Sequence, residues 1–484
     1  MILTILAIPV ILALLAQLIR DRRAFSILNI FGHAATLGLC LRLTFDFASG
    51  KIAQTTFSIF YLDSLSAFFL TLTGFIAFCA ALYSHGYIKH EVNQAIITER
   101  KARGYYSLFN LFVFTMLVVP SVANLGLVWA AIEMTTLVSA FLVGFHNSRH
   151  SVEAAWKYII ICSVGISLAL LGIILLYYTV LLHGASRTLD WTTINTLAVK
   201  LDPKILKIAF VFIFIGFGTK AGIAPMHNWL PDAHSQSPSP ISAMLSGVLL
   251  KASLYAVIRV FGILSRAGQA QFCQSLFIFF GLLSLGLAAG FILAQKDIKR
   301  LLAYSSVEHV GICLLGLGFG PLAALGALLH IANHAATKSL MFFGAGNVVA
   351  LYGTNNKNLI RGVINTLPFT GIMLLLGSFA LAGSPPFSVF LSELWILNAG
   401  FSLGKTKLVA LALLFMAIAF AGIIMHFSRI IFGRKPENIA AEPEPWSAKL
   451  AFIALLGPML VFGLYLPNGL QKFLGECTRI IFGT

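Results

Sequence analysis

The chain has 484 residues, of which 58% are hydrophobic and 10% are charged, and its mean hydropathy is +0.91. No water-soluble domain buries so much apolar sequence, so the composition excludes a soluble protein and predicts a polytopic membrane protein. The net charge of +16 does not indicate nucleic-acid binding, because the basic residues lie in short loops between apolar runs, where they set membrane topology.

The apolar runs predict about fourteen transmembrane helices and therefore an all-α polytopic fold. A transmembrane β-barrel is excluded, because it would alternate apolar and polar residues in segments of about ten residues. In chain order, the predicted spans are 2–19, 25–45, 60–83, 105–122, 124–145, 153–182, 205–223, 240–264, 272–294, 301–319, 322–350, 366–400, 406–432 and 447–466. The longest polar loops, 84–104 and 184–204, are too short for a soluble domain, and the tail after Pro467 is expected to form one short interfacial helix.

The basic residues predict the orientation of these spans. The first apolar run has no positive charge before it and is followed by Arg20, Arg22 and Arg23, the reverse of a secretory signal. Loops after odd-numbered spans hold more lysine and arginine than the others, for example Arg100 and Lys101 after the third. The odd loops are therefore expected to be cytoplasmic, with both termini facing outward.

Two spans contain proline-rich breaks, near 224–231 and near 383–386. Proline removes a backbone donor and clashes with the preceding helical turn. The freed carbonyl groups are tolerated in a membrane only where they are buried in protein or line a wet cavity. A pair of interrupted spans in corresponding positions predicts an inverted-repeat transporter core.

The order of spans and breaks predicts four parts. The separation of Glu133 from Lys220 is close to that of Glu308 from Glu393, which gives weak support to a repeat. The expected parts are the N-terminal helices (1–104), a first repeat of five helices (105–264), a second repeat (272–432), and a last helix with a short tail (447–484).

Charged residues inside the apolar runs are the main functional candidates. A lysine at mid-span costs about 2.5–3.5 kcal/mol on insertion scales, so Lys220 and Lys251 indicate a functional site. Glu133 also lies at mid-span, and a Glu–Lys pair that forms and breaks can load and release a proton. The alternatives are lysines that extend to the membrane interface and a neutral Glu133 bonded to a neighbouring helix.

The segment HIANHAATKSLMFF places His330, His334 and Lys338 at i, i+4 and i+8, on one face of a helix. Histidine titrates near neutral pH, which suits a proton relay. A purely structural polar stripe and a metal site are the alternatives. The metalloprotease pattern H-E-x-x-H is absent, because residues 331–333 are Ile-Ala-Asn.

Further titratable residues are candidates for the same proton path. Glu393 follows the second break and is expected to be the last protonatable group before an exit. For Glu308 and His309, proton relay and structural pairing remain open, and for Lys157 anchoring and relay remain open.

The six cysteines form no C-x-x-C motif and no cluster. Iron–sulfur and zinc sites need grouped thiolates, so we expect no redox cofactor and no bound metal in this chain.

Three segments resemble the antiporter-like proton-channel family: GFGTKAGIAPMHNWLPDAHSQSPSPISAMLSGVLLKASLYAVIR, QKDIKRLLAYSSVEHVG and HIANHAATKSLMFFGAGNV. This family includes the large proton-pumping membrane subunits of respiratory complex I, large subunits of Mrp-type antiporters and membrane subunits of group 4 hydrogenases. The resemblance covers about residues 60 to 460, and YSSVEHVG is most similar to the hydrogenase-4 component F type.

The resemblance implies fourteen spans with two inverted five-helix repeats. It also implies roles: Glu133 and Lys220 as the input pair, Lys251 as the central group and Glu393 as the exit residue. His330, His334 and Lys338 would continue the central axis. Some relatives have lysine at the exit position, where this chain has Glu393.

The implied function is a proton-translocating subunit of a complex I-like membrane-bound hydrogenase in a prokaryotic inner (plasma) membrane. The implied partners are other membrane subunits, peripheral nickel–iron hydrogenase and iron–sulfur subunits, and lipid. An Mrp-type Na⁺/H⁺ antiporter subunit, a complex I subunit and a non-transporting scaffold are the alternatives.

Overall fold

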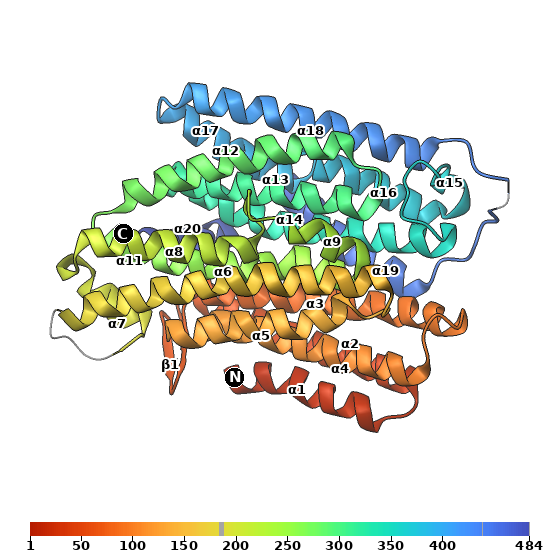
Figure 1. The fold of residues 1–484 in the computed structure, drawn as a ribbon, viewed down its shortest axis with the longest axis horizontal. Coiled ribbons are helices and arrows are strands. Elements are labelled where there is room, and N and C mark those ends of the chain that lie inside the picture. Colours follow the sequence, from red (N-terminus) through yellow and green to blue (C-terminus); the bar gives the residue numbers. More distant parts are fainter. Residues whose placement is uncertain (183–187, 438, 484) are drawn as a thin grey trace.

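The computed structural model describes residues 1–182, 188–437 and 439–483, so the last residue of the predicted C-terminal part lies outside the described residues. The described chain is a bundle in which the long helices run roughly parallel to one another (Figure 1). The sequence-based expectation of an all-α membrane protein is confirmed at this level, since helices form nearly all of the regular structure.

The first elements are α1 (Ile2–Leu18), α2 (Arg22–Ala48), β1 (Thr55–Phe57), β2 (Phe60–Leu62), α3 (Ser64–Asn93) and α4 (Glu99–Val118). The next are η1 (Val119–Ser121), α5 (Leu125–Val143), α6 (Arg149–Leu182), α7 (Trp191–Leu197), η2 (Ala198–Lys200), α8 (Pro203–Ala221), α9 (Trp229–Gln236), α10 (Ser239–Met244), the π-helical turn η3 (Leu245–Leu249) and α11 (Leu250–Arg266).

The second half holds α12 (Ala270–Ala294), α13 (Ile298–Gly318), α14 (Pro321–Tyr352), α15 (Val363–Thr366), α16 (Pro368–Leu381), α17 (Ser388–Ser402), α18 (Thr406–Phe432), α19 (Trp446–Leu464) and α20 (Asn468–Phe482). The last of these is the short helix expected after Pro467.

Ten helices within the described residues are long and apolar enough to cross a membrane. Each of the remaining predicted spans also coincides with a helix or a helix pair, namely α1, α8, α14 and α16 with α17. Of these, α1 and α16 are shorter, whereas α8 carries three lysines and α14 carries two histidines and one lysine.

Side-chain caps fix where several helices begin. Asp63, Asn124, Asp202 and Asp297 each precede a helix and accept hydrogen bonds from backbone N–H groups in its first turn. Such caps satisfy donors that have no partner within the helix.

Both predicted breaks are confirmed. Helix α8 ends at Ala221 and is followed by Gly222, which has a left-handed φ of 78°, and α16 is followed by Gly383 with a φ of 69°. In the first break, Gly222 to Ala224 and Trp229 are buried, whereas Pro225 and Asn228 are exposed. Two of its buried polar groups have partners: Trp229 Nε1 donates to the Thr219 carbonyl at 2.8 Å, and the Ala224 amide donates to Ser284 Oγ at 3.1 Å. Non-helical backbone at this depth is therefore satisfied by the protein itself.

Two predicted loops are wrong in part. Helix α3 continues to Asn93 and α4 begins at Glu99, so the connection between them is much shorter than the predicted loop 84–104. In the additional helical turns of α3, Glu91 accepts a hydrogen bond from His146 Nε2 at 2.9 Å. The described part of 184–204 contains α7 and η2. The β1–β2 hairpin was not predicted, and it delays the start of the third helix from 60 to Ser64.

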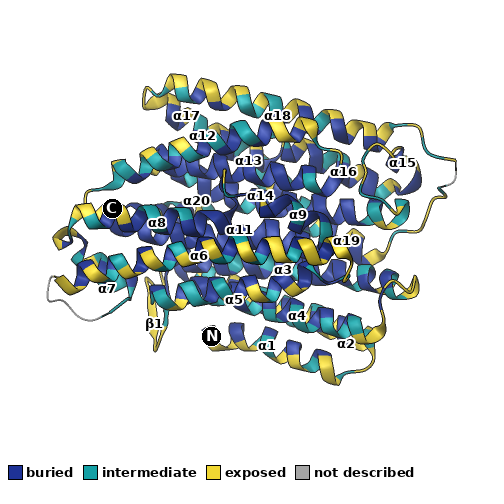
Figure 2. Ribbon diagram, in the orientation of Figure 1, coloured by how far each residue is buried: buried dark blue, intermediate teal, exposed yellow. Residues whose placement is uncertain are grey.

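The central helices are the most deeply buried. The apolar windows of Ser239–Arg266 and Ile298–Gly318 are wholly buried, whereas only 28% of the window of α18 is buried. Figure 2 shows the same gradient, with α11, α13 and α14 dark and the peripheral α1, α6 and α18 lined with exposed residues. The peripheral helices therefore insulate the centre, where the candidate site lies.

We predict that Gly216→Ala destabilises the protein by about 1–3 kcal/mol, because α6 and α8 approach too closely for an added methyl group. A Cβ at Gly216 would lie 2.4 Å from the Ala169 amide nitrogen and 2.5 Å from the Gly165 carbonyl oxygen, and both are backbone atoms that cannot rotate away. The matched control is Gly290→Ala on α12, where a Cβ meets nothing within 4 Å. Apparent melting temperatures in detergent test the pair, and equal values for both variants would contradict it.

Candidate functional site

Lys220 lies at the end of α8 and is completely buried. Its ammonium donates to Thr136 Oγ1 at 2.7 Å and to the hydroxyl of Tyr158. The Thr136 hydroxyl in turn donates to the carboxylate of Glu133 at 3.2 Å, which also accepts from Ser163 Oγ at 3.1 Å. We call these five residues the Lys220 cluster.

The structure thus brings the predicted pair Glu133 and Lys220 together, but through a hydroxyl. No direct ion pair joins them among the described residues. Thr136 accepts from the lysine and donates to the glutamate, which gives a continuous hydrogen-bonded connection between a cation and a carboxylate. Hydroxyl groups can hold either role because the hydroxyl hydrogen rotates.

Lys251 is buried at the start of α11, directly after the π-helical turn η3. Its Nζ donates to the Ser246 carbonyl at 2.6 Å and lies 2.5 Å from Nδ1 of His334. Single π-helical turns in α-helices are often found at functional sites. Lys251 and the predicted histidine stripe are therefore directly connected.

The stripe itself includes a third histidine from the neighbouring helix. His309 on α13 stacks between the two stripe residues, with ring centroids 5.0 Å from His330 and 4.6 Å from His334. His309 Nδ1 and His330 Nε2 are 2.9 Å apart, and His330 Nδ1 lies 3.0 Å from Ser392 Oγ. We call Lys251, His309, His330, His334 and Ser392 the histidine cluster.

Lys338, Glu308 and Glu393 surround this cluster and are all buried. Lys338 donates to the Leu302 carbonyl at 2.6 Å and to the hydroxyl of Ser305. Glu308 and His309 thus lie with the other predicted residues in the interior of the bundle.

Lys157 does not join either cluster. Its side chain is 49% exposed and pairs with Glu153 at 2.7 Å and Asp232 at 3.3 Å. The adjacent residue Tyr158 points inward instead and bonds to Lys220. The two residues are neighbours in sequence, so a rotation of about 100° along the helix separates the exposed ion pair from the buried contact.

The Lys220 cluster and the histidine cluster are separate in this structure. No hydrogen bond or ion pair joins them among residues 1–182, 188–437 and 439–483. Their supporting helices α8 and α11 nevertheless pack on each other.

Sequence reasoning missed several polar residues that complete these clusters. Thr136 and Tyr158 carry no charge and give no signal in an apolar run, although Thr136 is one helical turn from Glu133. Arg259 follows Lys251 at i+8 and so lies on the same face of α11, a pattern that would have revealed it.

Arg259 forms a buried ion pair with Asp63. Its two terminal nitrogens donate to the two carboxylate oxygens at 2.7 and 2.5 Å, and both side chains are at most 5% exposed. The guanidinium also lies 4.2 Å from the ring centroid of Trp191. This fixed, bidentate pair contrasts with the lysines, whose hydrogen-bond partners are uncharged.

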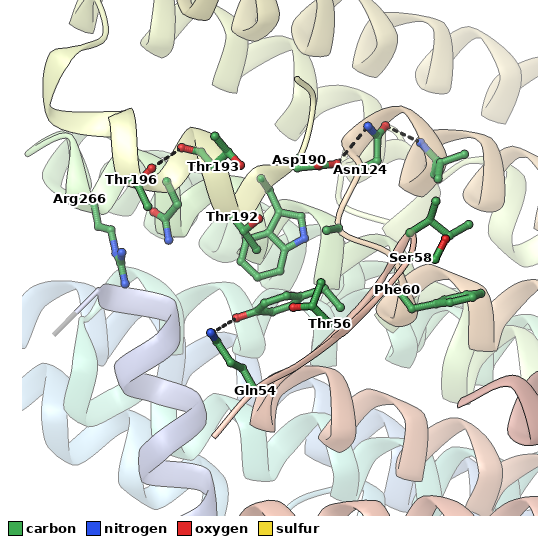
Figure 3. A pocket seen from close by; sticks show the side chains of 16 residues that line it. Gln54, Thr56, Ser58, Phe60, Asn124, Asp190, Thr192, Thr193, Thr196 and Arg266 are labelled. Atoms are coloured by element: carbon green, nitrogen blue, oxygen red, sulfur yellow. Dashed lines mark hydrogen bonds between the residues drawn. The ribbon is translucent and has the colours of Figure 1, made fainter. Parts of the chain in front are cut away.

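A polar cavity of about 710 Å³ opens beside the β1–β2 hairpin and α7 (Figure 3). Its lining includes Gln54, Thr56, Asp190, Thr193 and Arg266. None of the predicted proton-path residues contributes to its wall. The cavity is thus distinct from the buried clusters.

Two family descriptions match the sequence. Residues 122–419 match "NADH:quinone oxidoreductase/Mrp antiporter, TM", and residues 53–95 match "NADH-Ubiquinone oxidoreductase (complex I), chain 5 N-terminus". The first range includes every residue of both clusters. It does not include the N-terminal helices α1 to α4.

Similar proteins include the hydrogenase-4 component F homolog of Methylacidiphilum infernorum, 37% identical over 88% of this chain and 89% of that protein. Hydrogenase-4 component B of Escherichia coli is 31% identical over 82% of this chain and 60% of that protein. Among solved structures, a chain of an archaeal membrane-bound sulfane sulfur reductase has a TM-score of 0.86, with 23% identity over 99% of this chain and 97% of that one. A chain of the Mrp complex of Dietzia has a TM-score of 0.85, with 18% identity over 99% and 96%.

We predict that Lys220→Met leaves the apparent melting temperature unchanged or raises it, because an apolar side chain replaces a buried cation whose direct hydrogen-bond partners are uncharged. Arg259→Met should lower stability by about 3–5 kcal/mol, because it leaves the buried Asp63 carboxylate unpaired. Thermal unfolding of both variants in detergent tests the contrast. Strong destabilisation by Lys220→Met would mean that the lysine is a structural residue.

Proposed function

Because the chain belongs to the NADH:quinone oxidoreductase/Mrp antiporter family, as an antiporter-like membrane subunit, we propose that it conducts protons in a complex I-like membrane-bound hydrogenase. The observation that carries this proposal is the set of fully buried lysines and histidines at the centre of the bundle. Ionisable groups inside a membrane are costly, and they usually mark an ion pathway.

In the proposed path, a proton enters at Glu133 and Lys220, whose connection runs through the Thr136 hydroxyl. It then passes through Lys251 to His334 and the remaining histidines, beside Lys338 and Glu308. Glu393 is the proposed exit. Lys157, exposed and ion-paired, is at most an entry-side contact.

Transfer along such a path requires an energy source outside this chain. Moving one charge against 100 mV costs about 2.3 kcal/mol. Redox chemistry in partner subunits would supply it by changing the electrostatic field along the buried polar groups. The proposed partners are further membrane subunits and peripheral nickel–iron and iron–sulfur subunits; the similarity to hydrogenase-4 components supports this choice.

We also propose fourteen spans in a prokaryotic plasma membrane, with both termini outward and two inverted five-helix repeats at 105–264 and 272–432. The regions 1–104 and 447–484 would flank them. The two helix breaks, one within each proposed repeat, support this division.

An Mrp-type Na⁺/H⁺ antiporter subunit is the second candidate, because the likeness in fold to a chain of the Mrp complex extends over 99% of this chain. The two candidates share the same buried residues. They differ in whether partner subunits with redox chemistry are present in the complex.

The first test is proton translocation by the intact complex with Lys220→Ala. Loss of the buried ammonium should lower the rate by at least about tenfold, as expected for removal of a proton-transfer group. Lys204→Ala is the matched control, since Lys204 lies on the same helix but is exposed at its first turn. Undiminished translocation by Lys220→Ala would remove this residue from the path.

The second test is the subunit composition of the complex purified through a tag on this chain. A nickel–iron subunit with iron–sulfur proteins is the expected result. Recovery of membrane subunits alone, with proton exchange driven by Na⁺, would favour the antiporter.

A further inference from the structure

Three potential metal ligands converge within the histidine cluster and its border. His309 from α13, His330 from α14 and Glu393 from α17 each offer one ligand atom, and these atoms lie within 4.8 Å of one another. All three residues are buried. The sequence analysis expected no bound metal and kept a site at His330 and His334 only as an alternative. Nothing in the sequence indicated that His309 and Glu393 approach His330 from two other helices.

The outer nitrogens of the two histidines determine their tautomers. His309 Nε2 lies 3.2 Å from the Leu381 carbonyl, which can only accept, so Nε2 carries a hydrogen. His330 Nδ1 lies 3.0 Å from Ser392 Oγ, whose hydroxyl hydrogen is donated to the Val389 carbonyl at 2.7 Å. When Ser392 Oγ keeps that bond it accepts from His330, and Nδ1 of His330 then also carries a hydrogen.

The two inner nitrogens are consequently unprotonated when both rings are neutral. His309 Nδ1 and His330 Nε2 then point lone pairs at each other across 2.9 Å. Two lone pairs at that distance repel, so this arrangement favours a cationic centre, either a proton or a metal ion, between or beside them. The carboxyl group of Glu393 lies next to both nitrogens and would balance that charge when ionised.

We propose that His309 Nδ1, His330 Nε2 and the Glu393 carboxylate form a binding site for a divalent cation of the zinc class. Two histidines and one glutamate are a known zinc ligand set that leaves a fourth position open. The outer hydrogen bonds to Leu381 and Ser392 orient both rings, as second-shell partners do in metal sites. This inference goes beyond proton transport, and protons and metal ions compete for the same lone pairs.

For the two nitrogens the fit requires only a small movement, and the Glu393 oxygen, within 4.8 Å of both, would move closer. With Zn–N bonds of about 2.0–2.1 Å, tetrahedral geometry separates two nitrogens by about 3.3 Å, a few tenths of an ångström more than observed. The nearby His334, Lys251, Lys338 and Glu308 lie outside the ligand set. When protonated, Lys251 and Lys338 oppose the binding of a metal cation, whereas an ionised Glu308 favours it.

The second helix break provides a route to this site. Gly383 lies directly against Glu393, because a Cβ built on that glycine would fall 2.1 Å from the carboxylate oxygen. Pro385 and Pro386, which follow in the same break, are exposed on the surface of this chain. The carboxylate is therefore the ligand nearest to the exterior.

The test is Zn²⁺ binding to the full-length chain in detergent, measured by competition with a chromophoric chelator. We expect one tightly bound Zn²⁺ per chain, and a loss of affinity of at least about tenfold in His309→Gln, His330→Gln and Glu393→Gln. His33→Gln is the control, since His33 is also buried but lies on α2 and bonds to Asn110. Wild-type affinity in all three variants, or no Zn²⁺ bound by the wild type, would overturn the proposal.

X-ray absorption of the Zn²⁺-loaded wild type tests the site without any substitution. Two imidazole nitrogens at about 2.0 Å and a carboxylate oxygen are expected. A spectrum with sulfur ligands, or with water and a single histidine, would place the ion elsewhere. Failure of Zn²⁺ binding together with a strong effect of Lys220→Ala on proton translocation would overturn this site and leave the proposed function intact.

Discussion

The absence of water from the bilayer interior is the constraint on which this structure depends. Every backbone group there must be satisfied by the protein, which is why the described chain is almost entirely helical and why side chains bond to backbone groups at and before its first break. The same constraint places polar side chains at the centre of the bundle, where other helices can supply their partners. Peripheral helices with apolar exposed faces separate that centre from lipid.

The buried cations are held in two different ways. Arg259 is fixed by a bidentate carboxylate, so neither partner can change charge without leaving the other unpaired. Lys220, Lys251 and Lys338 donate instead to hydroxyl groups, backbone carbonyls or an imidazole. A lysine held by neutral acceptors can lose its proton without creating a buried unpaired anion. This difference separates charges that stabilise the fold from charges suited to transfer.

Much of the fold could be predicted because the physical signals are strong and local. Apolar runs located the helices, and Pro225 and Pro386 located the breaks. The predicted residues Lys251 and His334 do meet, yet the sequence did not reveal that His309 stacks beside them or that Thr136 lies between Glu133 and Lys220. Those contacts depend on how helices distant in sequence rotate against one another, and helical periodicity within one segment carries no information about that. The β1–β2 hairpin was missed because it is only three residues on each strand.

The π-helical turn at Leu245–Leu249 has a consequence for the geometry of α11. A π-helical turn accommodates one residue more than an α-helical turn, so the segments on its two sides are offset by about 100° relative to a continuous α-helix. Lys251 lies two residues after this turn, and its ammonium contacts His334 and the Ser246 carbonyl. If the extra residue of the π-helical turn moved past Lys251 along the helix, the ammonium would turn around the helix axis while both ends of the helix kept their register. Such a shift would reorient one charge without moving the bundle.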